Sequence, residues 1–193
     1  MTAVGARSTA SLGDSDVLAG LATIMRPLLP ELIAYIADEI QLQIVEYSGD
    51  ADESQAATTR LAVARAITYF VDRIEDPSAP RDEVDELFRR LGHGEAFAGR
   101  SLDSLRAAYQ IGARRAWKGL HAFALEHGLP SSTLGDLGDA LFDFINVLSE
   151  QSAAGYHDAQ AQLSDAAYQW RERLLRLIVS PTSAHNEIRK SVV

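Results

Sequence analysis

From Ser101 to Trp117 the chain reads SLDSLRAAYQIGARRAW, and this stretch decides the class of fold. Ser101 has a side-chain oxygen suited to capping a helix N-terminus, and Asp103 places an acid in the first turn, where the helix dipole favours negative charge. Small and apolar residues then recur at helical spacing as far as His127. The sequence GLP at 128–130 is a helix stop, since Gly suits the left-handed cap and Pro does not continue the helix. A helix over about 101–127 is therefore predicted.

The same spacing continues on both sides of this helix. Upstream it predicts helices over about 17–28, 30–47, 54–75 and a short one from Asp82 that closes or loosens at the GHG sequence of 92–94. Downstream, apolar residues recur from Leu134 to Leu177 without a breaker, which predicts one long helix, or two nearly collinear ones, partly projecting beyond the body of the domain and ended by Pro181. No segment alternates as a strand does. The predicted fold class is all-α, with about six helices.

The domain organisation follows from these patterns. Residues 1–13 are small and polar and are predicted to be a disordered N-terminus. Residues 14–180 are predicted to form one helical domain, and 181–193 a polar linker cut short.

Composition excludes several classes of protein. The net charge is −9 at pH 7, and so acidic a surface repels phosphate, so neither nucleic-acid contact nor docking on anionic lipid is expected. The absence of cysteine excludes disulfides, thiolate metal sites and cysteine nucleophiles. We find no apolar stretch near the roughly 18 residues that cross a bilayer, and no secretory signal at the N-terminus. These features together predict a cytoplasmic protein.

No residue pattern predicts an enzyme, a metal site or a cofactor. The 5 histidines pair in no recognised ligand spacing. His121 lies toward the polar side of its helix and His127 directly precedes the terminating Gly, so neither resembles a haem ligand. The acids of 82–86 suit a first helical turn. A small helical enzyme or a haem globin stays open as a rival, and visible absorption of the purified protein would decide on haem.

One flank of the 101–127 helix is a candidate ligand site. Its side chains are polar or aromatic and are spaced by three or four residues: Arg106, Gln110, Arg114, Trp117 and His121. Because a guanidinium offers a planar fork of donors, this flank could bind a small anionic ligand. Alternatively, Arg114 pairs with an acid on a neighbouring helix and Trp117 is ordinary core.

The long C-terminal helix is a candidate dimer interface. It combines small residues, which allow close helix approach, with apolar ones that one compact domain does not need: Ser152, Gly155, Ala159, Trp170, Leu174 and Leu177. A second copy, forming a parallel coiled coil or helix bundle, would cover them, so a homodimer is predicted. The alternative is that this helix folds back over the first two helices of its own chain.

Two segments around this flank, 99–103 and 109–117, resemble the N-terminal helical domain of actinobacterial PucR/CdaR-type transcriptional regulators. Weaker similarities are the RLG sequence at 90–92, GLP at 128–130, and the segments 150–160 and 171–175. The resemblance spans roughly 15–180. That domain is in turn similar to the N-terminal domain of RsbR-type stressosome proteins, which is globin-like without haem. The resemblance thus implies a single globin-like, non-haem bundle.

The resemblance also implies a function. In such regulators this domain precedes a middle domain and a helix-turn-helix that binds DNA, and this chain ends at Val193 before either. It is thus expected to be a regulatory sensor and dimerisation domain that relays a signal through its C-terminal helix. No catalytic residues carry over. The alternative is a stressosome-type interaction scaffold without a small-molecule ligand, which a flat melting response to a metabolite panel would favour.

Overall fold

The computed structural model describes the backbone of residues 20–47 and 53–179, and the side chains of these except 53 and 177–179. All of the regular structure in these residues is helical and none is a strand, so the predicted all-α class is confirmed. The predicted disordered N-terminus at 1–13, the linker at 181–193, the stop at Pro181 and the Leu177 side chain lie outside the described residues.

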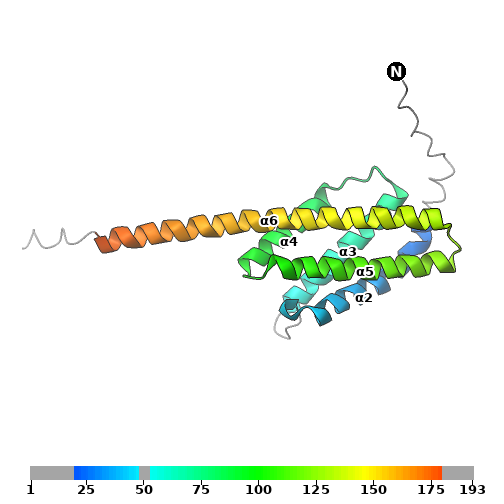
Figure 1. The fold of residues 1–193 in the computed structure, drawn as a ribbon, viewed down its shortest axis with the longest axis horizontal. Coiled ribbons are helices and arrows are strands. Elements are labelled where there is room, and N and C mark those ends of the chain that lie inside the picture. The colour runs from blue at the N-terminus through cyan, green and yellow to red at the C-terminus, as the bar shows by residue number, and fades with distance from the viewer. Residues whose placement is uncertain (1–19, 48–52, 180–193) are drawn as a thin grey trace, which may run out of the picture.

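The helices follow one another with short connections. After a helical segment at 20–25, the elements are η1 (Arg26–Leu28), α2 (Leu29–Gln43), η2 (Val45–Tyr47), α3 (Glu53–Glu75), α4 (Asp82–Phe97), α5 (Leu102–Glu126) and α6 (Ser131–Val179). Figure 1 shows α5 and the first half of α6 side by side, with α2 along α5 and the second half of α6 projecting far beyond the other helices. Of the two possibilities predicted for this region, one long helix or two nearly collinear ones, the structure shows one continuous helix.

The predicted ends of α5 are confirmed. The Ser101 hydroxyl accepts a hydrogen bond from the backbone N–H of Ser104 at 3.1 Å, which caps the helix. At the other end, Gly128 has a φ of 63°, the left-handed conformation that closes helices without steric strain when no Cβ is present. These caps set the length of α5 and hence which of its residues face the bundle.

The predicted end of α4 is wrong. The helix passes through Gly92 and Gly94 and ends at Phe97. Gly92 is there for packing, because a Cβ at this position would lie 1.8 Å from the backbone oxygen of Ser152 in α6. The loss of helix propensity at a mid-helix Gly, up to about 1 kcal/mol, is therefore offset by close contact between two helices.

Close contact of α4 with α6 also corrects part of the predicted dimer interface. Ser152 and Ala159 have no exposed surface, and Gly155 is buried. A Cβ on Gly155 would lie 1.9 Å from the backbone oxygen of Arg89 in α4. These three residues therefore pack inside one chain, and the prediction that a second copy covers them is wrong.

Three apolar clusters make up the core between the helices. One joins α2 to α5 through residues such as Ile36, Ile40 and Ala108, and another joins α3, α4 and α6 through Tyr69, Phe88 and Leu148.

The segment Gly20–Gln43 is long and apolar enough to cross a membrane, with a mean hydropathy of 1.2, so the expectation that no stretch reaches that limit was too strong. It nevertheless contributes Ile36, Ala37 and Ile40 to the interior of this domain, as core helices do.

Candidate functional site

The polar flank of α5 lies at the surface. Arg106, Gln110, Arg114 and His121 are exposed, and Arg106 forms an ion pair with Asp103 on its own helix at 3.4 Å. A cavity lies between the helices, and none of the five residues predicted to bind a ligand lines it. The structure therefore places them on one flank, as predicted, but does not gather them around an enclosed space.

Trp117, the aromatic member of that flank, packs against α6. A Cβ added to Gly138 would lie 2.7 Å from the indole, and the ring of Phe142 is 6.0 Å away between centroids. The His121 ring is at 6.2 Å. This packing fits the alternative interpretation of Trp117 as a residue that holds two helices together.

The charged contact from α5 to α2 is made by Arg115, which follows the predicted ligand residue Arg114 in the chain. Its guanidinium forms an ion pair with Glu39 and lies 5.3 Å from the centre of the Tyr35 ring. Both charged side chains are largely covered. The hydrogen bond from Arg115, together with one from Gln43, holds the pKa of the Glu39 carboxyl below its usual value.

Arg115→Ala is expected to lower the melting temperature at neutral pH, because it removes the partner that holds Glu39 ionised. The neighbouring exposed residue offers a matched control, Arg114→Ala, for which little change is expected. The difference between the two variants should shrink as the pH falls through the lowered pKa of Glu39, since the folded-state advantage of the carboxylate disappears once it is protonated. Equal melting temperatures at neutral pH would contradict the Arg115–Glu39 contact.

A cavity of about 220 Å³, partly open to the surface, lies between the helices and is lined almost entirely by hydrocarbon. Its α5 wall consists of small residues spaced by three or four positions: Ala108, Gly112, Ala116 and Gly119. Opposite them, larger residues of α2 such as Leu32 and Ile36 complete the wall. A Cβ on Gly119 would lie 3.1 Å from Leu32 and one on Gly112 would lie 3.9 Å from Ile36. The side chains of α2 therefore fill part of the volume that the small residues of α5 leave, and the cavity is what remains.

One end of this cavity is polar. Glu95 is only 2% exposed, and its carboxylate accepts hydrogen bonds from Arg100 at 2.8 and 3.0 Å and from the Tyr47 hydroxyl at 3.1 Å. Arg100 also donates to the side-chain oxygen of Gln55 at 2.9 Å. The end of α4, the α4–α5 link, η2 and α3 thus meet at a buried ion pair. Burial, reinforced by the Glu95 carboxylate, raises the pKa of Tyr47 and keeps its phenol neutral.

A second polar contact joins this region to α6. The hydroxyls of Tyr109 and Ser152 are 2.5 Å apart, and Ser152 donates to the backbone oxygen of Phe88 at 2.9 Å. Burial raises the pKa of Tyr109. Further along α6, Tyr156 donates to the backbone oxygen of Arg100 at 3.0 Å. The buried ion pair is therefore connected to α6 through the backbone of one of its own members.

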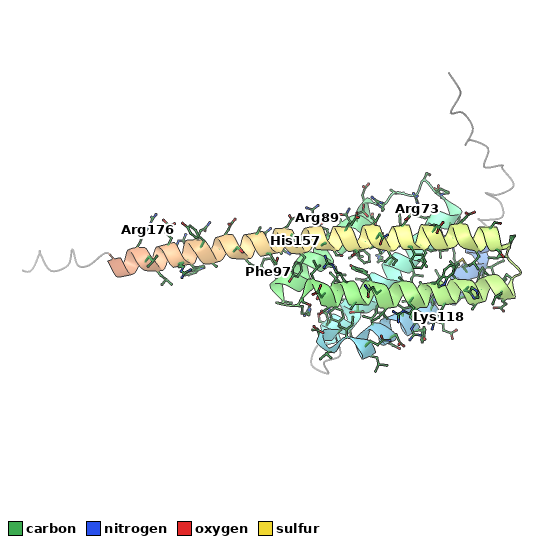
Figure 2. All side chains as sticks on the ribbon, in the orientation of Figure 1. Arg73, Arg89, Phe97, Lys118, His157 and Arg176 are labelled. Carbon is green, nitrogen blue, oxygen red and sulfur yellow. The ribbon has the colours of Figure 1, made fainter. Side chains whose placement is uncertain are left out.

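Beyond this point α6 leaves the bundle. Figure 2 marks the exit with Arg89 and His157 and the far part of the helix with Arg176. From 160 to 176 every side chain is exposed. Four apolar residues follow one another at intervals of four, three and four, as along the seam of a coiled coil: Leu163, Ala167, Trp170 and Leu174. We call these residues the α6 seam.

Sequence reasoning missed the cavity and its polar end. A signal was present at Glu95, which falls at helical spacing from Phe88 and Leu91 and so places a charge on an apolar face. The small residues of α5 also share a face, but that pattern indicates close helix packing as readily as a cavity. Where such residues leave space depends on the side chains of the opposite helix.

Comparison with known protein families shows to which family the chain belongs. The model of the PucR-like N-terminal domain family matches residues 15–179, which is most of the chain and includes every helix from α2 to α6. No curated protein matches the chain. No solved structure matches it either, so the predicted likeness to globins stays a prediction.

Proposed function

We propose, because this chain belongs to the PucR-like N-terminal domain family, that it is the regulatory sensor and dimerisation domain of a cytoplasmic transcription regulator. Membership in this family supports a regulatory role and not an enzymatic one. The domain would sense a signal in its helical body and relay it through α6 to a DNA-binding part that these residues do not contain.

The observation that carries the proposal is the division of α6 into two halves. The part of α6 up to Ala159, with Leu141 and Leu148, packs in the bundle, whereas every side chain from 160 to 176 is exposed. A single helix that is core at one end and free at the other can convert a change in packing into a movement outside the domain. Only a ligand with different affinities for two packings would drive such a change.

A second copy is the proposed partner of the exposed half. The α6 seam has the period of a two-stranded coiled coil, and Gln160 extends it at a position where one polar residue can fix the register. In a parallel pairing, Arg171 of one copy would face Ala166 of the other, so the basic residues beside the seam would not repel one another. Helix-turn-helix proteins bind paired half-sites as dimers, which gives such pairing a purpose.

Cysteine cross-linking tests this pairing directly, because the chain has no cysteine of its own. Ala167→Cys places a thiol on the α6 seam, and Asp165→Cys places one on the opposite side of the same helix. A parallel, in-register dimer should give a disulfide-linked dimer on mild oxidation of the first variant and very little of the second, since disulfides need Cα atoms within about 7 Å. Equal, low cross-linking of both variants would contradict the proposal.

A further inference from the structure

The cavity between the helices has the size of a small molecule. An apolar cavity of about 150 Å³ in a helical protein stays dry and accepts benzene, and by that scale the 220 Å³ found here would accept about nine heavy atoms. Its lining runs along α5 from Leu105 to Phe123, about 27 Å at 1.5 Å per residue, so the space is elongated. An extended alkyl chain suits this shape better than a fused ring system.

The walls of the cavity set the character of most of the ligand. Side chains such as Leu32, Ile67 and Phe70 present only carbon to the space. Water inside an apolar space lacks partners, because it needs two to four polar groups around it. A hydrocarbon chain would instead gain contacts along its whole length.

The polar end determines which head group fits. Glu95 accepts three hydrogen bonds, from Arg100 twice and from Tyr47 once, so its carboxylate has room for about one more donor. Its charge is matched by that of Arg100. A carboxylate head would meet the Glu95 carboxylate, which lines the cavity. An ammonium head would bring a second positive charge to a carboxylate whose charge Arg100 already matches, and would lose its own hydration. A neutral hydroxyl that donates to Glu95 avoids both costs.

We propose that this cavity binds a neutral amphipathic molecule, an alkyl chain of about eight carbons with a terminal hydroxyl. The chain would lie between α2, α3 and α5 and the hydroxyl at Glu95. This inference deepens the proposed function by naming the class of ligand sensed. It also connects ligand to relay, because Leu141, Ile145 and Leu148 of α6 line the same space.

Octanol is the probe for the test, with octanoate and octylamine as charged counterparts of nearly equal size. Titration of the full chain, followed by the amide signals of its NMR spectrum, should show saturable binding of octanol with shifts at residues around the cavity. The two charged probes should bind at least about tenfold more weakly at neutral pH. Octanol that does not saturate, or octanoate that binds as tightly, would overturn the proposal.

Two variants locate the binding. Ala116→Leu fills the cavity and should weaken octanol binding at least about tenfold. Ala122→Leu makes the same substitution on the exposed face of α5 and should leave binding unchanged. If the first variant does not fold, Gly112→Ala replaces it, because the nearest atom to its new Cβ would be 3.9 Å away, on Ile36. Undiminished binding in a folded cavity variant would place the ligand elsewhere and overturn the proposal.

The inference and the proposed function fail separately. Octanol binding is a property of the bundle and should persist in a chain whose α6 seam no longer pairs. A dimer that does not bind octanol would overturn the ligand class alone. If the wild-type chain is monomeric and binds octanol, the proposed class of ligand would stand and the proposed dimer would be overturned.

Discussion

Gly155→Ala is expected to lower the free energy of unfolding by about 3 kcal/mol or more, since overpacking at a contact that cannot yield exceeds the usual cost of 1–3 kcal/mol. The added Cβ would lie 1.9 Å from the backbone oxygen of Arg89 and 2.8 Å from its carbonyl carbon. Backbone atoms of a helix cannot rotate away as a flexible side chain can. The gain in helix propensity, up to about 1 kcal/mol, would be far too small to compensate. Denaturant unfolding measures this loss.

The same helix provides the control for this substitution. Gly135 also lies in α6, but nothing stands within 4 Å of a Cβ built there. Gly135→Ala should therefore leave stability unchanged or raise it by up to about 1 kcal/mol. If Gly155→Ala were as stable as Gly135→Ala, α4 and α6 would not meet at backbone distance, and the account of how α6 is held would be wrong.

The contact at Gly155 matters because it lies just before α6 becomes free. Close by, Arg89 and Asp158 form an ion pair at 2.6 Å on the surface of the same joint. Both side chains are about half exposed, so this pair adds little stability by itself. The backbone contact therefore fixes the position from which the exposed half projects.

Trp170→Glu combined with Leu174→Glu is expected to give a monomeric, folded protein. The two side chains are 64% and 53% exposed within one chain, so the substitutions remove no contact inside the domain. In the proposed dimer they would place charges opposite one another in a desolvated seam, where unpaired charge is strongly unfavourable. Sedimentation equilibrium measures the mass, and circular dichroism confirms that the helices remain.

A second double variant matches the first in chemistry and position along the helix. Tyr168 and Leu175 are 71% and 55% exposed and both lie one residue beyond a seam position. Tyr168→Glu with Leu175→Glu should leave the dimer intact, since these positions point away from the seam. Dissociation of both variants would mean that added charge, not the α6 seam, controls association.

Helix boundaries were predictable where local chemistry sets them. The Ser101 cap and the Gly128 stop are properties of single residues, and both act in the structure as their chemistry predicts. The GHG sequence at 92–94 led to a wrong prediction of where α4 ends, and the reason is physical. A Gly inside a helix can mark its end or a close approach of another helix, and only the position of α6 decides between them.

The sequence correctly predicted that the small residues of α6 allow another helix to approach closely. It did not predict that this helix is α4 of the same chain. Ser152, Gly155 and Ala159 pack on α4 of the same chain. A pattern on one helix specifies the distance at which a neighbour can lie and not which helix that neighbour is. The cavity is a related case, since it depends on how the α5 wall and the side chains opposite it combine.

The solution mass of the 193-residue chain tests most directly whether a second copy covers the exposed half of α6. Sedimentation equilibrium at micromolar concentration should give twice the 21.0 kDa of one chain. A mass of 21.0 kDa that does not rise with concentration would contradict the account, because residues 160–176 would then have no partner of their own kind through which to pass a signal.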